Sequence, residues 1–226
     1  MKASIIIRTK NEQKWLPVAL EMLAKQTEKD FEVLIIDSGS TDNTLAIARK
    51  SKEMLNLRIY QIKPEDFTYP YACNFGASKA SGEFIVYLSG HSVPINNRWL
   101  ENGLKDFDSN KVAGVYGNVH PLPDASIWEK IYYGAGFKTK KKIIRKARIG
   151  VLGNTNAIIR KELWQKYNFD EKLVEGGEDT AWARHYLEKG FIVIRDSNFS
   201  VYHSHGLGFG KFLKQVRHWH TISKIK

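Results

Sequence analysis

The sequence predicts an α/β fold with a mostly parallel central sheet flanked by helices, and three observations indicate this. Residues 3–8 and 31–37 are runs of branched apolar residues, which are typical of buried parallel strands. Residues 12–27, between them, place Leu16, Leu20 and Leu23 on one side of a helix. Because parallel neighbours need a crossover connection, the three segments form a β-α-β unit.

The rest of the chain continues this alternation, with residues 64–70 as a loop. We expect strands over residues 57–62, 83–88, 112–119, 151–159, 191–194 and 199–203. We expect helices over residues 42–52, 71–80, 96–107, 124–134, 180–190 and 209–222. A length of 226 residues suits a single domain, residues 1–226, with a substantial core.

The composition is that of a globular protein, with 42% hydrophobic and 12% aromatic residues. Cys73 is the single cysteine, which excludes an internal disulfide and favours a reducing compartment. The first apolar run is too short for a signal peptide, and no stretch approaches the apolar length of about 18 residues that a spanning helix needs. We therefore expect a cytoplasmic protein.

Positive charge is concentrated in one segment. The net charge is +11, and residues 138–148 hold seven basic residues in eleven positions, which leaves +4 (11 − 7) for the rest of the chain. Such a block favours an anionic partner: a diphosphate, an anionic membrane surface or nucleic acid. A solvated loop without a partner is the alternative. The candidate anion-binding side chains are Lys140, Lys141, Lys142 and Arg145.

Polar residues follow the first two predicted strands. Residues 9–12 come after the first strand and residues 37–42 after the second. Ligands of open α/β sheets bind at the carboxyl ends of the strands, so these residues outline a site for a molecule with hydrogen-bonding edges and hydroxyls. The alternative is that Ser40 or Asp42 only caps the next helix.

Two segments resemble a known family. RTKNE at residues 8–12 and VLIIDSGSTDNT at residues 33–44 resemble the nucleotide half of inverting family-2 glycosyltransferases with the GT-A fold. The resemblance implies a Rossmann-like, nucleotide-binding half over residues 1–95 and a donor-sugar and acceptor half over residues 96–205. It also implies that Thr9, Glu12 and Asp37 line the pocket for the base and ribose. A carboxylate can accept hydrogen bonds from a base imide and from ribose hydroxyls.

The resemblance continues through the pattern F-x-Y…N-x-G…GE-x-I-x-Y-L at residues 67–88. It implies that Asn74, Ser89 and Gly90 lie near the nucleotide. For Asn74 the alternative is a surface position within a helix.

The segment Ser89-Gly90-His91-Ser92 stands where members of this family carry Asp-x-Asp, which holds Mg²⁺ or Mn²⁺ against the donor diphosphate. No carboxylate is present at residues 89, 91 or 92. Some similar enzymes use Asp-x-His with a later histidine, and His91 with His203 or His205 fits that variant. Three interpretations stay open for His91: a ligand of Mg²⁺ or Mn²⁺, a direct partner of the diphosphate, and a structural residue.

The segment EGGED at residues 175–179 resembles the family's Glu-Asp pair at the start of a helix. It implies that Asp179 is the catalytic base and that Glu178 orients the loop or binds acceptor, with Asn154 beside the donor sugar. An inverting transfer needs one base, which removes the proton of the attacking hydroxyl. The alternative is that both acids only compensate the helix dipole.

The resulting hypothesis is an inverting glycosyltransferase that moves a sugar from a UDP- or dTDP-sugar to a saccharide or lipid-linked saccharide, as in bacterial rhamnosyltransferase-type members building surface polysaccharide. A nucleotidyltransferase would need a glycine-rich phosphate loop, which is missing. A basic module that binds nucleic acid or a membrane would explain residues 138–148 but not Glu178 and Asp179, so we expect no nucleic-acid partner.

Residues 206–226 hold the C-terminal amphipathic helix. It either packs on the body of the enzyme or lies on the inner face of a membrane as a peripheral contact. Because the chain ends in KIK directly after it, we also consider a homodimer in which the partner supplies acceptor-binding residues.

Overall fold

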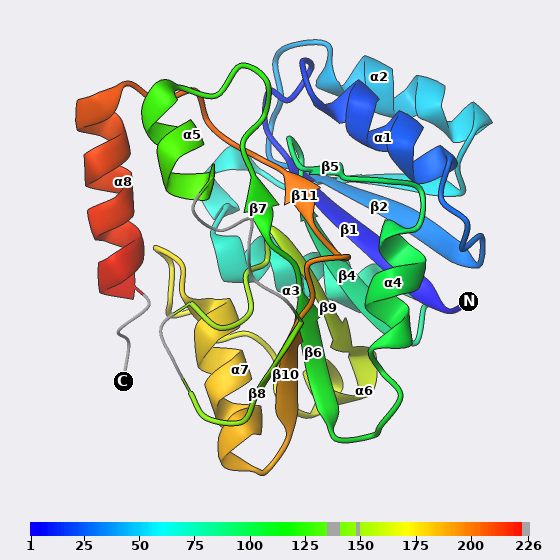
Figure 1. Ribbon diagram of the computed structural model, residues 1–226. Helices are drawn as coiled ribbons and strands as arrows, with labels where there is room; N and C mark the ends of the chain where they lie inside the picture. The colour runs from blue at the N-terminus through cyan, green and yellow to red at the C-terminus, as the bar shows by residue number, and fades with distance from the viewer. Residues whose placement is uncertain (135–140, 148–149, 223–226) are drawn as a thin grey trace.

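A large sheet forms the centre of the protein in the computed structural model, which describes residues 1–134, 141–147 and 150–222 (Figure 1). Six of its strands run parallel, and β9 and β8 run antiparallel to their neighbours. The predicted α/β fold with a mostly parallel sheet is thus confirmed. In spatial order the strands are β3 (Leu57–Gln61), β2 (Phe31–Asp37), β1 (Ala3–Thr9), β4 (Phe84–Ser89), β9 (Asn156–Arg160), β6 (Val112–Tyr116), β10 (Ile192–Arg195) and β8 (Lys142–Ile144).

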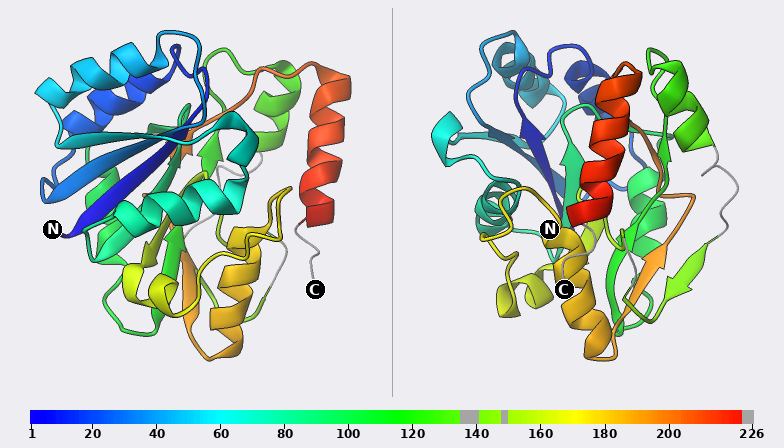
Figure 2. Two further views of the ribbon diagram at one scale, coloured as in Figure 1. Left: turned by 180° about the vertical axis from the view of Figure 1, so that it is seen from behind. Right: turned by 90° about the vertical axis from the view of Figure 1, so that its left-hand side faces the viewer.

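Helices cover both faces of this sheet because alternate residues of each buried strand point to opposite sides (Figures 1 and 2). One core joins Ile5 and Ile7 of β1 to α1 (Leu16–Ala24), α2 (Thr44–Lys50) and α4 (Trp99–Lys105). The other joins Ile6 to α3 (Tyr69–Lys79), α6 (Lys161–Lys166) and α7 (Glu178–Glu188). Two short 3-10 helices, η1 (Ser51–Glu53) and η2 (Pro64–Asp66), lie between α2 and α3 along the chain.

A second, three-stranded sheet lies beside the carboxyl ends of the main strands. Its strands, in spatial order, are β5 (Val93–Pro94), β11 (Val201–Tyr202) and β7 (Val119–His120). The pairing of β11 with β5 brings residues near 203 next to the segment after β4. This small sheet therefore joins two segments about a hundred residues apart at one edge of the molecule.

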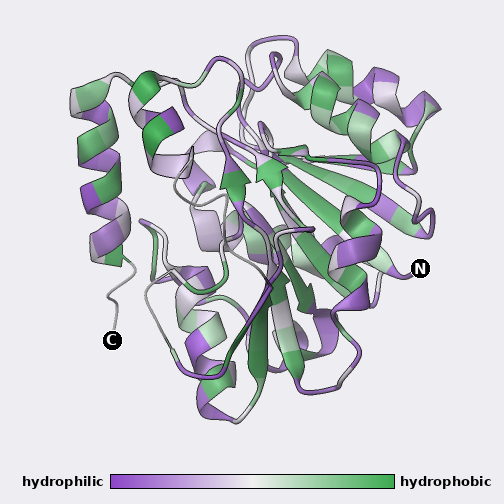
Figure 3. Ribbon diagram, in the orientation of Figure 1, coloured by the Kyte–Doolittle hydropathy of each residue, from purple (hydrophilic) through white to green (hydrophobic). Residues whose placement is uncertain are grey.

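Helices α5 (Ile127–Gly134) and α8 (Phe209–Ile222) stand side by side, apart from the two main cores (Figures 1 and 2). Aromatic rings join them: Trp128 lies 4.6 Å from Phe209, and Tyr132 lies 5.5 Å from Phe212, between centroids. Figure 3 shows apolar and polar residues alternating along α8. Several large apolar side chains of the pair stay exposed, namely Ile127, Trp128, Ile131, Tyr132, Phe209 and Leu213. No helix of the described residues is long and apolar enough to cross a bilayer.

The structure corrects several predicted boundaries. Helix α1 begins at Leu16 rather than residue 12, with Pro17 in its first turn, where a proline needs no hydrogen-bond partner. The strand expected over residues 112–119 ends at Tyr116 because Gly117 packs against the Phe199 carbonyl, where a Cβ atom would lie 1.5 Å from the oxygen. The strand expected from residue 151 begins at Asn156.

The basic segment also contains an unexpected strand. Residues Lys142–Ile144 form β8, which pairs with β10 at the edge of the main sheet. An edge strand with a basic residue is a common protection against pairing with another chain.

Candidate active site

A cavity of about 620 Å³ opens at the carboxyl ends of β1 and β4. Thr9, Glu12 and Ser89 line one side of it, after the first and fourth strands of the sheet. Glu178 and Asp179 line the other side, from the start of α7. The structure therefore brings together two groups of predicted site residues that are far apart in the chain.

A second cavity of about 570 Å³ adjoins the first and shares part of its wall, including Gly153, Thr155 and His203. It carries aromatic and cationic side chains: Tyr116, Tyr132, Tyr133, Trp219, Lys142 and Arg195. This cavity was not predicted from the sequence, because its lining comes from several separate segments.

Asp37 lies directly behind the wall of the first cavity rather than on it. The side chain is fully buried, and its carboxylate accepts hydrogen bonds from the Thr9 hydroxyl at 3.0 Å and the Ser40 amide at 2.9 Å. Register explains the contact, because Thr9 and Asp37 are paired across β1 and β2. Asp37 thus fixes Thr9 and the turn after β2. Asp42, one position before Asn43, the N-cap residue of α2, accepts from the Thr44 amide at 2.9 Å.

Asn74 does not line either cavity. Its amide oxygen accepts from the Trp164 indole at 2.9 Å, and its amide nitrogen donates to the Phe169 carbonyl at 2.9 Å. These bonds tie α3 to the segment between α6 and α7, which is a structural use of the side chain.

Gly90 is also absent from the lining, but the site depends on its lack of a side chain. A Cβ atom there would lie 2.7 Å from the Glu12 side chain and 2.9 Å from the Arg8 carbonyl. Glycine therefore allows the turn after β4 to pack against the residues that follow β1.

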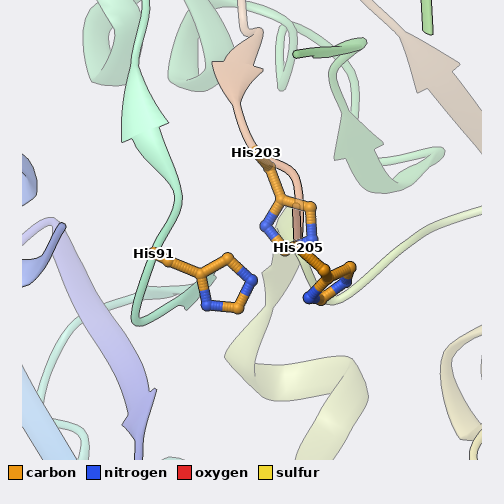
Figure 4. A group of neighbouring side chains, drawn as sticks. All are labelled: His91, His203 and His205. Carbon is orange, nitrogen blue, oxygen red and sulfur yellow. The ribbon is translucent and has the colours of Figure 1, made fainter. Parts of the chain in front are cut away.

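Three histidines gather on the wall of the first cavity. The candidate ligand atoms of His91, His203 and His205 all lie within 4.8 Å of one another (Figure 4). His91 Nδ1 donates to the Glu12 carboxylate at 2.7 Å, and His203 Nδ1 is hydrogen-bonded to the Ser92 hydroxyl at 3.0 Å. Burial holds the pKa of His203 well below its usual range and lowers the pKa of His205 to about 4, with the neighbouring His91 adding to both shifts. Both imidazoles are therefore neutral near pH 7.

The two acids stand at the first turn of α7, after a loop that only glycine suits. Gly176 and Gly177 have φ values of 111° and 90°, in the left-handed region. The Asp179 carboxylate accepts from the Asn154 amide at 3.0 Å, and the Glu178 carboxylate accepts from the Asn154 side chain at 3.1 Å. Asn154, predicted to lie near the donor sugar, thus contacts both acids.

Burial shifts the proton affinities of both acids. Desolvation, with the Asp179 charge beside it, raises the pKa of Glu178 to about 7. Desolvation also raises the pKa of Asp179, although hydrogen bonds from Asn154 and Thr180 and the Arg8 charge oppose the shift. A carboxylate with a raised pKa is a better proton acceptor, which suits a general base.

Arg8 also lines the cavity, although its sequence position did not predict this. Its guanidinium lies between the two sides of the cavity, donates to the Asn154 carbonyl at 2.9 Å, and has a buried Nε atom without a hydrogen-bond partner among the described residues. A charged residue inside a run of buried strand residues was the available signal, since such a charge is rarely buried without a partner.

Helix α8 forms part of the cavity wall, which was also not predicted. Gln215, His218, Trp219 and Ile222 line the cavity from this helix. The His218 imidazole donates to the Glu175 carbonyl at 3.2 Å, and the Ile222 side chain lies against Gly176. The prediction that this helix packs on the body of the enzyme agrees with these contacts.

The predicted anion-binding residues do not act as one group. Lys140 lies outside the described residues. Lys141 pairs with Asp106, Lys142 lines the second cavity, and Arg145 is exposed and lines neither cavity. Of the four, only Lys142 reaches a cavity within the described part of the chain.

The model of glycosyl transferase family 2 matches residues 4–167. The chain belongs to this family. It is therefore a glycosyltransferase, and the alternatives of a nucleotidyltransferase and of a basic binding module are not favoured. The GT-A form of the α/β fold is confirmed by the solved structures described below.

This family-2 glycosyltransferase resembles enzymes of archaea and bacteria. It is 28% identical over 94% of its length to a dolichyl N-acetyl-α-D-glucosaminyl phosphate 3-β-D-2,3-diacetamido-2,3-dideoxy-β-D-glucuronosyltransferase of Methanococcus voltae, of which it covers 70%. It is 26% identical over 91% of its length to the O-antigen chain rhamnosyltransferase RfbN of Salmonella typhimurium, of which it covers 67%.

The fold is similar to that of two solved glycosyltransferases. The S. aureus enzyme TarS in complex with UDP matches 98% of the chain with a TM-score of 0.70 at 23% identity, and 65% of its own chain is covered. The mannosyltransferase PcManGT of Pyrobaculum calidifontis, in complex with GDP-Man and Mn²⁺, matches 98% of the chain with a TM-score of 0.70 at 19% identity, and 68% of its own chain is covered. The chain thus spans about two thirds of the length of these structures.

Proposed function

We propose that this glycosyltransferase transfers a sugar from a nucleotide-diphosphate donor to an acceptor hydroxyl with inversion at the anomeric carbon. One observation carries the proposal: Asp179 and the polar residues that follow β1 and β4 share the wall of one cavity. A donor lying across that cavity has its nucleotide near Thr9 and its sugar near Asp179. Residues 1–95 then hold the nucleotide and residues 96–205 the donor sugar and acceptor.

The proposed donor is a UDP- or dTDP-sugar. TarS has been solved with UDP and with UDP-GlcNAc, and PcManGT with GDP-Man. Thr9, Glu12 and Ser89 offer hydroxyl and carboxylate groups to the base and ribose. Asp37 contributes by holding Thr9 and the turn after β2 in place.

In the proposed mechanism, Asp179 removes the proton of the attacking hydroxyl as the bond to the diphosphate breaks on the opposite face of the sugar. Asn154 positions this carboxylate through its backbone amide and positions Glu178 through its side chain. Glu178 and Asn154 bind the donor sugar or the acceptor.

The departing diphosphate needs positive charge, which Arg8 and Lys10 supply on the cavity wall, and the three histidines offer hydrogen-bonding nitrogens beside them. The histidines also fit a divalent cation, because the buried Nε2 atom of His91 has no hydrogen-bond partner among the described residues. A divalent cation bound there would neutralise charge on the leaving diphosphate.

We assign the acceptor, a saccharide or a lipid-linked saccharide, to the second cavity. Its tyrosine and tryptophan rings offer flat apolar faces to sugar rings, and Lys142 and Arg195 offer charge to a phosphate. A relative that is 25% identical over 85% of the chain is a GalNAc(5)-diNAcBac-PP-undecaprenol β-1,3-glucosyltransferase of Campylobacter jejuni. This supports a role in the synthesis of surface polysaccharide.

A membrane surface is the proposed location of such an acceptor. The exposed apolar side chains of α5 and α8, with Lys130, Lys211 and Lys214 on the same helices, suit an anionic bilayer surface on the cytoplasmic side. If a second copy of the chain covers this face instead, the face is a dimer interface and not a membrane contact.

The proposal is tested by comparing the wild-type enzyme with Asp179→Asn. We expect calorimetry to show UDP or dTDP binding of equal affinity in both, because the substitution leaves the nucleotide side of the cavity unchanged. We expect nucleotide release from the matching sugar nucleotide to fall about 10²–10⁴-fold, the range for loss of a general base. Turnover retained in Asp179→Asn, or no binding of any nucleoside diphosphate to the wild type, would contradict the proposal.

A further inference from the structure

The three-histidine cluster (His91, His203 and His205) is assembled from two segments of chain. His91 lies in the turn between β4 and β5, and the other two follow β11, which pairs with β5. Pairing of these short strands therefore sets the distance between the segments. Figure 4 shows the three imidazole rings converging on one small region, and their candidate ligand atoms all lie within 4.8 Å of one another.

Two of these rings are oriented by bonds at Nδ1, which leaves Nε2 for a ligand. The Glu12 carboxylate accepts from His91 Nδ1, and the Ser92 hydroxyl bonds His203 Nδ1. His91 Nε2 is buried without a hydrogen-bond partner among the described residues. In metal sites, the second nitrogen of a ligating histidine is commonly held in this way by a carboxylate or another polar group.

The third histidine is placed by its backbone. The His205 amide donates to the carboxylate of Glu129 at 2.8 Å, and Glu129 is itself fully buried. The His205 ring is exposed toward the cavity and can rotate, whereas the His203 ring is buried. A cation with ligand distances of about 2.0–2.1 Å needs nitrogens closer than those seen here, and rotation of the exposed ring would bring them together.

The chemistry of the ligand set decides which cation fits. Mg²⁺ prefers six oxygen ligands and is normally held by carboxylates and phosphates. The Glu12 carboxylate accepts a hydrogen bond from His91 Nδ1 through one of its oxygens, and residues 89, 91 and 92 are serine, histidine and serine. Imidazole nitrogens suit Zn²⁺, Co²⁺ and Ni²⁺, and affinity for nitrogen sites rises from Mn²⁺ through Co²⁺ to Ni²⁺.

We infer that the three-histidine cluster is a site for a nitrogen-preferring divalent cation of the Zn²⁺, Co²⁺ and Ni²⁺ class, and that it does not bind Mg²⁺. Three protein ligands leave positions open toward the cavity, where phosphate oxygens can complete the coordination. Binding of phosphate oxygens at the open positions rests on the proposed function. Binding of the metal by the protein alone is independent of the proposed function.

Cobalt provides the direct test, because its visible absorption reports its ligands. Metal-depleted full-length protein is titrated with Co²⁺ at neutral pH, and then with Zn²⁺ or Mg²⁺ as competitor. We expect one equivalent of Co²⁺ to bind with intense visible bands, Zn²⁺ to abolish the bands, and a large excess of Mg²⁺ to leave them unchanged. Displacement of Co²⁺ by Mg²⁺, or no saturable binding of Co²⁺ or Zn²⁺, would overturn the inference.

Variants test whether the visible absorption of Co²⁺ comes from the three-histidine cluster. His205→Ala, at an exposed position, should abolish the cobalt bands, and so should His91→Ala if circular dichroism shows that it folds. Glu12→Gln should retain the bands with roughly 10–100-fold weaker binding, the usual cost of losing an outer-shell partner. His185→Ala is the matched control, since His185 stacks on Tyr167 far from the cluster in α7. Wild-type binding in His205→Ala would overturn the assignment.

Binding of UDP is measured in parallel on the same metal-depleted and metal-loaded samples. Cobalt binding without binding of UDP, dTDP or any other nucleoside diphosphate contradicts the proposed transferase function and supports the metal site. UDP binding with no cobalt binding overturns the metal site and leaves the transferase function standing.

Discussion

At the scale of single residues, Asn154 and Arg8 organise the two acids at the start of α7, Glu178 and Asp179. Asn154 bonds both acids, and Arg8 donates to the Asn154 carbonyl from the end of β1. Two adjacent acids within a partly buried wall repel one another, and burial adds to the cost of ionising both. One of them therefore holds its proton to a higher pH than a free carboxyl group would.

This proton makes stability depend on pH. The pKa of Glu178 is raised from an ordinary value of 4.5 to about 7, so its contribution to stability is full below pH 4.5 and is lost as the pH rises through 7. We expect the free energy of unfolding of the wild type, relative to Glu178→Gln, to fall by an amount on the order of 3 kcal/mol between pH 4.5 and 7.5.

Urea denaturation of both proteins across this pH range measures the difference. Titrating groups away from α7 are common to both proteins and cancel, so the difference reports Glu178 together with its interaction with Asp179. Parallel pH profiles for the two proteins would show that the pKa of Glu178 is not raised in the folded state.

At the scale of elements, α8 acts as a wall of the active site although it belongs to neither main core. Phe212 is its one buried residue and packs on Tyr132 of α5. Gln215, His218 and Trp219 on the same helix line the cavity. Loss of one ring contact should therefore change the site without unfolding the sheet.

We expect Phe212→Ala to lower protection of residues 209–222 against hydrogen exchange and to weaken binding of the donor nucleotide. Deleting a buried phenylalanine ring costs about 3 kcal/mol, which should accelerate exchange of this helix by about 100-fold or more. The melting temperature should change little, because neither main core includes Phe212.

Leu213→Ala is the control, since Leu213 is its exposed neighbour on the same helix. Hydrogen exchange followed by mass spectrometry and calorimetry with UDP measure the two effects. A large fall in melting temperature in Phe212→Ala would show that α8 is part of the main cooperative unit.

At the scale of the whole molecule, polar and apolar surfaces are arranged around one opening. Residues of α8 line both cavities and Tyr132 of α5 lines the second, while other apolar side chains of the two helices are exposed. The two helices stand side by side in Figure 1. A lipid-linked acceptor could then have its chain in a bilayer and its sugar in the second cavity.

We expect the protein to co-sediment with vesicles that contain anionic lipid, and to do so more weakly at high salt because the basic side chains on α5 and α8 contribute. Ile131→Glu should reduce the bound fraction, since Ile131 is 63% exposed on α5.

Met54→Glu is the matched control, because Met54 is similarly exposed, at 57%, but lies beyond η1 and lines neither cavity. Equal binding of both variants would contradict the membrane face. A concentration-dependent dimer that Ile131→Glu disrupts would assign the face to a second copy of the chain instead.

The features that sequence predicted well are those that local patterns determine. The strands at β1, β2 and β4 have apolar runs with few alternatives, and the position of Asp179 follows from a glycine loop before a helix. Asn74 was harder, because an amide at a helix surface can bind a ligand or a neighbouring segment, and only the fold decides that it bonds Trp164 and Phe169.

Features that depend on distant contacts could not be predicted in the same way. The role of Arg8 depends on its hydrogen bond to the carbonyl of Asn154, which is 146 positions away. The second cavity and the wall formed by α8 require knowledge of how several distant segments meet. Within the basic segment, nothing local distinguishes Lys142, which reaches a cavity, from Lys141, which pairs with Asp106.

The position of β9 has a consequence for how the chain folds during synthesis. This strand inserts between β4 and β6 and pairs with β4 through residues near 84–88. Until residue 160 has left the ribosome, β4 remains an open apolar edge, and such edges are prone to intermolecular pairing. We therefore expect the nascent chain to fold late and to depend on chaperones, because β1 to β4 form a complete sheet only after β9 pairs with β4.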